Sequence, residues 1–270
     1  MRRLLPDTRE EDLGDLYTAL AFPPPPAGRP YVYLDMVASA DGAATVDGRT
    51  RELGRSADAL AFSRLREWCD AILVGASTVR IEDYGPPRPK DEARARREAR
   101  GLDPYPRLVV VTRSLALNPG GRLFSEASRP PVVLVPEDAD EDRLGALRGV
   151  AEVVQAGAGG VDLVLALGEL RRLGVAYLLC EGGPTLNAEL LARGLVDELF
   201  LTVSPQLVGL SDLRIVDGPL AGSPSPLELV ELREHEGELL CRYRVLEGAG
   251  SEGVEEPVAS LKADSPREAP

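Results

Sequence analysis

Seven short apolar runs, separated by segments of helical pattern, dominate the middle of the chain. They are YVYLDMVA (31–38), AILVG (71–75), RLVVVT (107–112), PVVLV (131–135), AEVVQ (151–155), AYLLC (176–180) and ELFLTVS (198–204). Several are apolar at nearly every position, as expected of strands that are covered on both faces. Apolar residues at helical spacing in 57–68 and 162–173 indicate helices that supply this cover. The alternation predicts an α/β fold with a mostly parallel central sheet flanked by helices.

The last expected strands differ from the others. LELVELREHEGELLCRYRVLE contains two strand-like runs joined at Glu236-Gly237, which predicts an antiparallel C-terminal hairpin at one edge of the sheet. Residues 83–106 are charged and contain proline, so they form either a helix across 90–100 or an excursion over a site.

Three regions are expected along the chain. Residues 1–30 form a lead-in that ends in the proline-rich connector PPPPAGRP, and residues 31–246 form one domain. Residues 247–270 are rich in Gly, Ser, Pro and Glu, and this composition predicts a disordered acidic tail.

Composition narrows the functional class. The net charge of −13 disfavours non-specific nucleic-acid binding, although a local pocket can still accept an anionic small molecule. No apolar run reaches the roughly 18 residues of a membrane span, and the first residues lack the apolar stretch of a signal peptide. Cys69, Cys180 and Cys241 are widely separated and odd in number. We therefore expect a cytoplasmic protein with reduced thiols and no metal site.

Ligands of an open parallel sheet bind beyond the carboxyl ends of its strands, so the residues after each strand matter most. Those residues are Ser39, Asp41 and Gly42; Gly75, Ser77 and Thr78; Arg113 and Ser114; and Glu181, Gly182 and Gly183. Small residues, hydroxyls, two carboxylates and one guanidinium together describe a crevice for a phosphorylated ligand.

Each of these groups also has a purely structural interpretation. Asp41-Gly42 alone is typical of a turn, and a glycine followed by hydroxyl residues at 75–78 is typical of a capped helix start. Gly182-Gly183 allows a tight turn into a helix that begins at Pro184, but it also presents free N–H groups to an anion.

Several well-known sites are excluded by the sequence. His235 is the sole histidine and lies in an acidic stretch, so no histidine-based triad is available. Neither a GxGxxG fingerprint nor a Walker A motif is present. Arg113 alone is typical of a surface charge. At the end of a strand, however, an arginine can accommodate the 2′-phosphate of NADP, so any nicotinamide cofactor is expected to be NADPH.

Three blocks, taken in order, resemble a known family. SADGAAT (39–45), LREWCDAILVGASTVRIED (65–83) and CEGGPTLNAELLARGLVDELFLTVSPQLVG (180–209) are similar to the reductase domain of riboflavin biosynthesis. The resemblance covers about residues 31–246 and is closest to stand-alone pyrimidine-reductase-like proteins. It implies a dihydrofolate-reductase-like fold. It also implies reduction of 5-amino-6-(5-phosphoribosylamino)uracil by NADPH to the ribitylamino product.

Some family features are missing from the chain. The H-x-E and P-C-x-x-C signatures of the zinc deaminase in bifunctional members are absent, so we expect a reductase only. The family's D-D-P becomes Glu82-Asp83-Tyr84-Gly85-Pro86, and its S-x-W-I-T segment becomes TRELGRS (50–56), without the tryptophan. Both changes lie where substrate and nicotinamide are expected to meet.

The resemblance also implies roles for single residues. Ser39, Arg66 and Glu181 match substrate-binding positions, and Arg66 is expected to hold the phosphate. Asp41 is the hypothesised proton donor. With the strand-end residues above, the predicted NADPH-binding set is Ala38, Thr45, Gly75, Ser77, Thr78, Glu82, Arg113, Ser114, Gly182, Gly183, Pro184, Thr185 and Leu186.

Three functions and one partner remain open at this stage. The chain is an NADPH-dependent pyrimidine reductase, an NADPH enzyme that acts on dihydrofolate or another imine, or a nucleotide-binding regulator without catalysis. The family is usually dimeric, and the apolar run ELFLTVSPQLVG is either the interface of a homodimer or a central buried strand.

Overall fold

The computed structural model describes residues 1–50, 52–209, 213–220 and 224–246. Its strands are β1 (Arg2–Leu5), β2 (Arg9–Glu10), β3 (Tyr31–Ser39), β4 (Ala71–Gly75), β5 (Arg107–Val111), β6 (Val132–Val135), β7 (Glu152–Gln155), β8 (Tyr177–Cys180), β9 (Glu198–Ser204), β10 (Leu227–His235) and β11 (Glu238–Val245). Its helices are the 3₁₀ turn η1 (Leu13–Asp15), α1 (Ser56–Leu65), α2 (Ala76–Ile81), α3 (Asp91–Ala99), α4 (Arg122–Ser125), α5 (Glu141–Arg148), α6 (Leu163–Arg172) and α7 (Pro184–Ala192).

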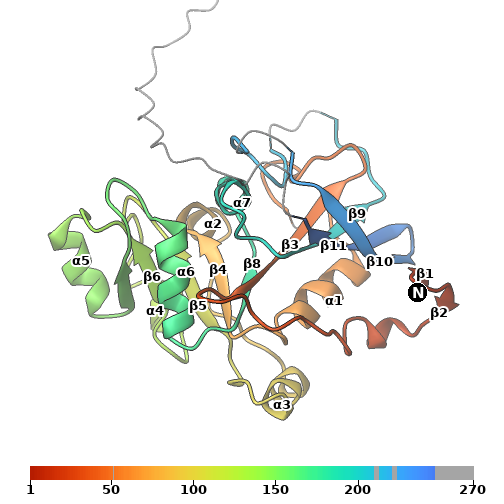
Figure 1. The fold of residues 1–270 in the computed structure, drawn as a ribbon, viewed down its shortest axis with the longest axis horizontal. Coiled ribbons are helices and arrows are strands. Elements are labelled where there is room, and N and C mark those ends of the chain that lie inside the picture. Colours follow the sequence, from red (N-terminus) through yellow and green to blue (C-terminus); the bar gives the residue numbers. More distant parts are fainter. Residues whose placement is uncertain (51, 210–212, 221–223, 247–270) are drawn as a thin grey trace, which may run out of the picture.

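The strands of the described residues join in one sheet with the order β2-β1-β10-β11-β9-β3-β8-β4-β5-β6-β7 (Figure 1). All neighbours from β9 to β7 run parallel, and all neighbours from β9 to β2 run antiparallel. This arrangement confirms the expected α/β class with a mostly parallel sheet. Each of the seven apolar runs forms a strand, and 71–75 and 198–204 do so with the expected bounds.

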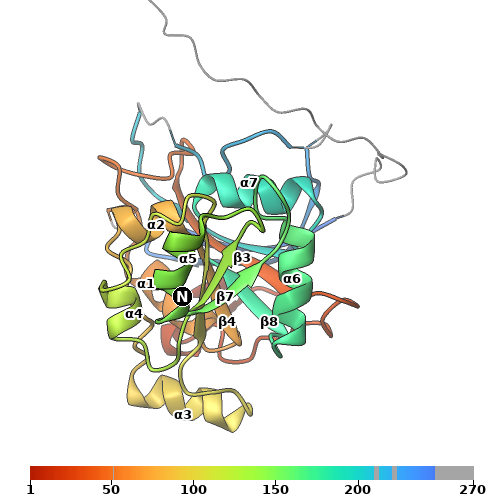
Figure 2. The same cartoon turned by 90° about the vertical axis from the view of Figure 1, so that its left-hand side faces the viewer.

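Alternate side chains of the parallel strands enter two separate cores, one on each face of the sheet. Tyr33 and Ile72 point into the core that α1, α2, α4 and α5 cover. Leu34 and Leu73, each one residue further along, point into the core that α6 and α7 cover. Helices therefore lie on both faces of the sheet (Figure 2), which is why its strands carry almost continuous apolar sequence.

The C-terminal hairpin forms as expected, but it does not lie at the edge of the sheet. β10 and β11 meet at Glu236 and Gly237, whose φ angles of 48° and 85° are those of a tight hairpin turn. β1 pairs with the outer side of β10, and β2 pairs with β1 (Figure 1). The expectation of an edge hairpin was wrong because strands from the lead-in cover it.

The lead-in also contributes to the core. Leu16, Tyr17 and Leu20 are buried against the helix-covered face that contains Tyr33. A short helix, α3, occupies part of the charged stretch after residue 83, as one of the two alternatives predicted. The expected disordered tail, 247–270, lies outside the described residues.

Candidate active site

A cavity opens where β3 and β8 stop pairing. The two strands are in parallel register from Tyr31–Tyr177 to Leu34–Cys180, whereas β3 continues beside β9 to Ser39. The cavity of about 510 Å³ lies beyond this last pair, at the carboxyl ends of the strands. Its lining residues are Asp35, Met36, Val37, Ala44, Thr45, Gly48, Thr50, Gly54, Arg55, Asp58, Ala59, Phe62, Thr78, Ile81, Glu82, Tyr84, Glu181, Gly182, Gly183, Pro184, Leu213 and Ile215.

Gly182 and Gly183 form one wall of this cavity, at the start of α7, and are called the glycine cradle below. The N–H of Gly75 donates to the carbonyl of Gly182 at 2.8 Å, which joins the end of β4 to the loop after β8. Gly182 has a φ of 83°, a conformation that side chains rarely adopt, and a cis peptide bond links it to Gly183. A Cβ on Gly183 would lie 3.0 Å from Oγ1 of Thr78. The wall therefore leaves room for a ligand only because it has no side chains.

The N-terminus of α7 faces the same space. Gly183 is the N-cap residue and provides no side chain to cap the helix, and Pro184 follows as the first helical residue. Both line the cavity. Uncapped N–H groups and the positive end of the helix dipole suit an anionic group such as a pyrophosphate.

The structure brings together some of the predicted site residues and leaves others apart. Those that line the cavity are Thr45, Thr78, Glu82, Glu181, Gly182, Gly183 and Pro184. Gly75 lies directly behind the glycine cradle. The other predicted residues, which do not line it, are Ala38, Ser39, Asp41, Arg66, Ser77, Arg113, Ser114, Thr185 and Leu186. Leu186 is instead packed in the core beneath α7.

Glu181 is held by two neighbours that come from different segments. Nε and Nη2 of Arg66 donate to its two carboxylate oxygens, each at 2.7 Å, and the hydroxyl of Tyr84 donates to the same carboxylate. Arg66 also lies over the ring of Phe62, with 3.9 Å to the ring centroid. Burial opposes the charge of Arg66, but the Glu181 carboxylate outweighs it and raises the pKa of the guanidinium. Burial and the same carboxylate raise the pKa of Tyr84.

Asp41 is placed as a structural anchor. Its carboxylate accepts from the hydroxyl of Ser39 and from the backbone N–H groups of Val208 and Gly209. The bond from Ser39, followed by the two backbone bonds, lowers the pKa of Asp41 to about 2. An ionised carboxylate that does not line the cavity does not suit the proton delivery expected of Asp41. Ser39 also belongs to this turn, because its hydroxyl accepts from the N–H of Ala43 at 2.8 Å.

Two carboxyl groups in the cavity were not anticipated from the sequence. Asp35 comes from the middle of β3, and Asp58 comes from the first turn of α1. Burial raises the pKa of Asp35 well above its usual range, and the charges of Asp58 and Glu181 add to this effect. Burial also raises the pKa of Asp58 to about 6. One signal for Asp35 was available in the sequence, namely a charged residue within an otherwise apolar strand.

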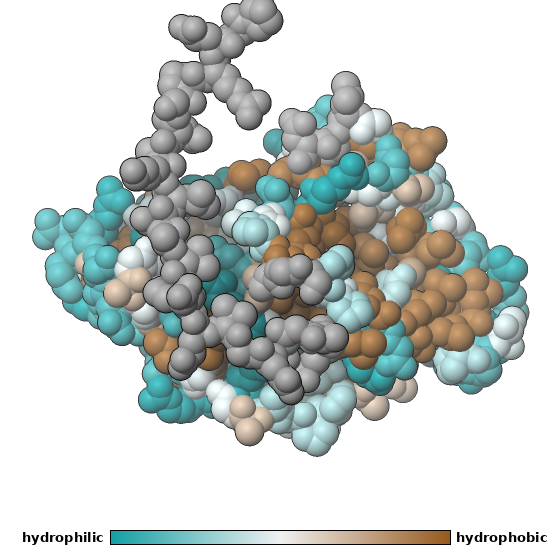
Figure 3. Space-filling model, turned by 45° about the horizontal axis from the view of Figure 1, so that its top comes forward, coloured by the Kyte–Doolittle hydropathy of each residue, from teal (hydrophilic) through white to brown (hydrophobic). Residues whose placement is uncertain are grey.

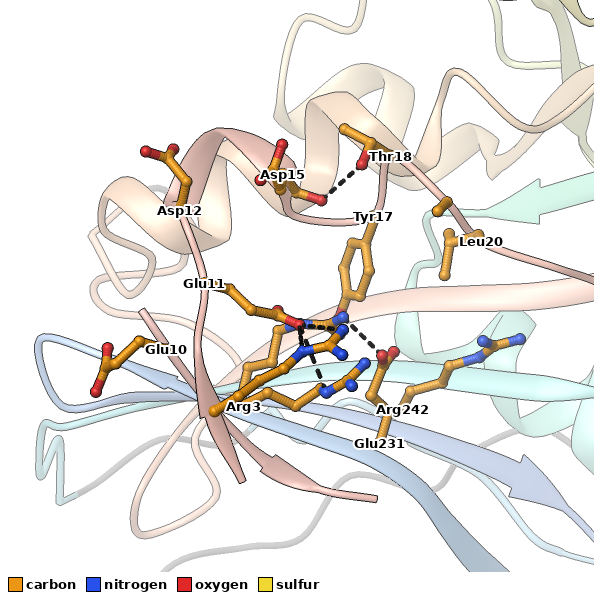
Figure 4. A pocket seen from close by; sticks show the side chains of 13 residues that line it. Arg3, Glu10, Glu11, Asp12, Asp15, Tyr17, Thr18, Leu20, Glu231 and Arg242 are labelled. Atoms are coloured by element: carbon orange, nitrogen blue, oxygen red, sulfur yellow. Dashed lines mark hydrogen bonds and ion pairs between the residues drawn. The ribbon is translucent and has the colours of Figure 1, made fainter. Parts of the chain in front are cut away.

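A second cavity, of about 440 Å³, lies between the N-terminal strands and β10 (Figure 4). Its charged side chains neutralise one another. Arg233 pairs with Glu11 at 2.9 Å and with Glu231 at 2.6 Å, and Arg3 lies 3.5 Å from Glu11. We assign this cluster the structural task of holding the lead-in strands against the sheet.

Two negative findings apply to the described residues. No group of three or more His, Cys, Asp or Glu side chains among them is arranged to hold a metal ion. None of the helices in these ranges is both long enough and apolar enough to span a membrane. Cys69, Cys180 and Cys241 are buried, and none of the three forms a disulfide bond.

Comparison with known proteins connects this geometry to a family. The family model described as the RibD C-terminal domain matches residues 30–240. A 2,5-diamino-6-ribosylamino-4(3H)-pyrimidinone 5′-phosphate reductase of Methanothermobacter thermautotrophicus is 37% identical over 191 residues, which cover 70% of this chain and 85% of that protein. A reductase of the same name from Archaeoglobus fulgidus is 34% identical and covers 67% and 83% of the two chains.

Solved structures agree with the sequence relatives. A pyrimidine reductase-like protein of Corynebacterium diphtheriae matches with a TM-score of 0.73 and 30% identity over 81% of this chain and 93% of the other. RibD of Acinetobacter baumannii matches with a TM-score of 0.64 and 20% identity over 82% and 59%, a likeness of fold alone. The expected resemblance is thus confirmed, and with it an oxidoreductase of riboflavin biosynthesis. The chain belongs to the RibD C-terminal domain family.

Proposed function

We propose that the chain uses NADPH to reduce a ribosylamino-pyrimidine 5′-phosphate to its ribitylamino product. The observation that carries this proposal is the pairing of two unlike walls in one cavity. A side-chain-free cradle at the N-terminus of α7 lies on one side, and the carboxyl groups of Asp35 and Glu181 lie with it in the same lining. The first wall suits a dinucleotide phosphate, and the second suits the donor groups of an aminopyrimidine.

NADPH is the cofactor that the residues support best. The glycine cradle would hold the pyrophosphate at the start of α7, and Thr45, Thr78 and Glu82 lie along the same cavity. Arg113 and Ser114 are exposed directly after β5, the strand next to β4, where an arginine can meet a 2′-phosphate. When bound, the cofactor supplies a hydride. The chain's contribution is to bind, orient and exclude water.

The structure suggests separate tasks for the two arginines near the substrate side. Arg66 already binds Glu181 at two points, so we infer that it fixes this carboxylate for the pyrimidine donors. Arg55 lies at the N-terminus of α1 and is the cation among the described lining residues. We therefore propose Arg55 as the partner of the substrate phosphate, in place of the direct phosphate contact expected of Arg66.

Two closely related substrates have to be distinguished. The pyrimidine expected from the sequence has an oxo group at C2, whereas the substrate named for the relatives from Methanothermobacter and Archaeoglobus has an amino group there. The chain covers 85% and 83% of these relatives but only 51% of RibD of Escherichia coli. We propose that the amino form is the preferred substrate, since Glu181 can accept hydrogen bonds from an amino group.

The experiment is to follow NADPH oxidation with both pyrimidines, with dihydrofolate and with NADH in place of NADPH. The proposal predicts the highest kcat/KM for the diamino pyrimidine with NADPH. Turnover of dihydrofolate alone would replace it with the second of the expected functions. Binding of NADPH without oxidation in any mixture would instead identify a regulator that lacks catalysis.

We also propose that the protein is a homodimer through one face of β9, β10 and β11. β9 is central in the sheet, so it is not itself an edge interface, but Leu201 and Val203 are only half-buried while Phe200 and Thr202 are buried. Leu227, Leu229 and Leu239 are exposed on the neighbouring strands. Apolar side chains gather over this part of the molecule (Figure 3), and such a patch favours association.

Light scattering coupled to gel filtration tests the dimer. Leu229→Glu introduces a charge in the proposed face and is expected to yield monomers. Leu165→Glu is the matched control, because Leu165 is 54% exposed on α6, far along the sheet from β10. A wild-type monomer at all concentrations would contradict the proposal.

A further inference from the structure

We propose that Asp35 is the proton donor to the substrate nitrogen during reduction, an inference that rests on the function proposed above. Opening of the ribose ring breaks the C1′–O4′ bond of the substrate and leaves an imine, C1′=N. The hydride that reduces this imine is only half of the reaction, because the nitrogen must also gain a proton. A group that supplies it has to face the ligand, hold its proton at working pH and be free of other partners.

The position of Asp35 meets the first condition. Asp35 is the residue directly after Leu34, the last residue of β3 that pairs with β8. It has the same parity along the strand as Tyr31 and Tyr33, which point toward the face covered by α1. Its side chain therefore lies on the face covered by α1, beside the point where the two strands separate, and it lines the cavity together with Asp58 of α1.

Its neighbours leave the carboxyl group free. Among the described residues, no hydrogen bond or ion pair joins the carboxyl of Asp35 to another group. The surrounding lining is largely apolar and includes Met36, Phe62 and Ile81. A carboxyl in such surroundings is stabilised in its neutral form, because the charged form loses water without gaining a partner.

The charges around Asp35 act in the same direction. Asp58 faces it from α1 and Glu181 from the loop after β8, and both raise its pKa, whereas Arg66 lowers it. Arg66 is already engaged by Glu181 and by the hydroxyl of Tyr84. Two carboxyl groups whose environments separate their pKa values are a common arrangement for acid catalysis.

Asp58 is suited to keep Asp35 protonated. It accepts a hydrogen bond from Thr202, and it faces the charge of Glu238 on β11. Its side chain lies against the backbone of Gly54, where an added Cβ would be 1.8 Å from its Oδ2. With a pKa of about 6, Asp58 is largely ionised at neutral pH, and its negative charge opposes ionisation of Asp35.

Other acids in or near the cavity are less suitable. Asp41 is ionised and bound to backbone N–H groups away from the cavity lining. Glu181 is already bound at both of its oxygens by Arg66. The hydroxyl of Tyr84 already donates its proton to Glu181, and its pKa is raised.

The chemical step balances with one hydride donor, the reduced nicotinamide. The imine carbon C1′ accepts the hydride with its electron pair, and the π electrons of the C=N bond become a lone pair on nitrogen. This nitrogen forms an N–H bond as the O–H bond of the Asp35 carboxyl breaks. Asp35 is left as a carboxylate beside Asp58, a pairing that favours its reprotonation from water after the product leaves.

The kinetic test compares Asp35→Asn with wild type and with Asp91→Asn, in which the same change is made on the exposed helix α3. Asparagine keeps the shape but has no acidic proton. We expect kcat to fall about 100-fold or more in Asp35→Asn, with KM changed only a few-fold, and to remain at the wild-type level in Asp91→Asn. The wild-type kcat should fall as pH rises through the pKa of Asp35, and this fall should disappear in Asp35→Asn.

Asp58→Asn gives an independent check on the geometry. Removal of the negative neighbour should move the fall in kcat to lower pH while activity at the acid side remains. A kcat of Asp35→Asn within a few-fold of wild type, with the same pH profile, would overturn the proposal. So would an unshifted profile in Asp58→Asn.

A readout without turnover separates this inference from the proposed function. The C=O stretch of a protonated carboxyl in the infrared spectrum of the unliganded protein should persist well above pH 6, where Asp58 ionises, and should be lost in Asp35→Asn. Absence of this band refutes Asp35 as the donor even if the wild type reduces the pyrimidine. A wild type that shows the band but reduces neither pyrimidine refutes the proposed function, and the donor role with it.

Discussion

Arg66 binds Glu181 in a bidentate manner, with Nε and Nη2 each 2.7 Å from one oxygen of the carboxylate. The side chain of Glu181 is 5% exposed and that of Arg66 is 22% exposed, so the pair is largely removed from water. It joins the end of α1 to the end of β8, and thus fixes the carboxylate at the point where the cavity opens.

Removal of this arginine should be costly for the fold. In Arg66→Ala the Glu181 carboxylate is left buried with only the hydroxyl of Tyr84, and such changes typically destabilise a protein by about 3 kcal/mol. Urea unfolding measures the loss. Arg88→Ala is the control, because the Arg88 side chain is 66% exposed in its pair with Glu126, and it should change the free energy of unfolding by less than about 0.5 kcal/mol. Equal losses of unfolding free energy in the two variants would show that the Arg66–Glu181 pair stabilises the fold no more than an exposed pair does.

Replacement of the two cradle glycines by alanine should impair the protein in different ways. Gly182→Ala forces a side chain into a φ of 83°, which is expected to destabilise the fold by roughly 1–2 kcal/mol. Gly183→Ala has an ordinary φ of −76°, but its Cβ crowds Thr78, so it should mainly weaken NADPH binding.

Gly101→Ala is the matched control for strain. Gly101 has a φ of 76° with nothing within 4 Å of an added Cβ, and it lies directly after α3. It should lower stability like Gly182→Ala and leave the Kd for NADPH unchanged. Fluorescence titration gives the Kd, and an unaltered Kd in Gly183→Ala would argue against a phosphate in the cradle.

Asp41→Ala should loosen a loop without altering the proton chemistry. The N–H groups of Val208 and Gly209 lose their acceptor, so their hydrogen exchange should become faster. The pKa of Asp41 is lowered to about 2, so its contribution to stability is present above the unfolded value of about 4 and is lost as pH falls toward 2. The variant should lack this acid-range loss, whereas the pH profile of kcat should match wild type. A changed kcat profile would restore Asp41 as a candidate donor.

Asp35→Asn should make the protein more stable at neutral pH. The folded pKa of Asp35 lies above its unfolded value, so the folded state holds the proton more tightly and loses relative stability as pH rises through the folded pKa. The asparagine variant should have a higher Tm, by about 2–4 °C for each kcal/mol gained in the free energy of unfolding. Its Tm should also decline less as pH rises. A lower Tm at every pH would indicate that Asp35 has a stabilising partner in solution.

Much of the sheet could be predicted because its strands are buried on both faces. Such strands need apolar residues at nearly every position, so they can be recognised in the sequence as continuous apolar runs. The lead-in strands could not be predicted in this way. β1 and β2 carry Arg2, Arg3, Arg9 and Glu10, and their pairing depends on β10, more than 200 residues away in the sequence. The partner, and not local preference, makes them strands.

The site was predicted in part for a similar reason. The loop after β8 could be found because glycines are required at fixed positions where backbone approaches backbone. The opposite wall depends on side chains that only the fold brings together, such as Asp35 of β3 and Asp58 of α1. The anchoring of Asp41 could not be predicted, because the N–H groups that donate to its carboxylate belong to Val208 and Gly209, 167 and 168 positions away.

The place at which β3 and β8 part has a consequence for redesign. The cavity begins where the backbone pairing of β3 and β8 ends, at Leu34 and Cys180, so strand pairing sets its position. The walls at Gly48, Thr50 and Glu82 are, in contrast, exposed and come from segments that join finished elements. An engineer can therefore exchange these segments to admit a different small molecule while the scaffold beneath stays intact.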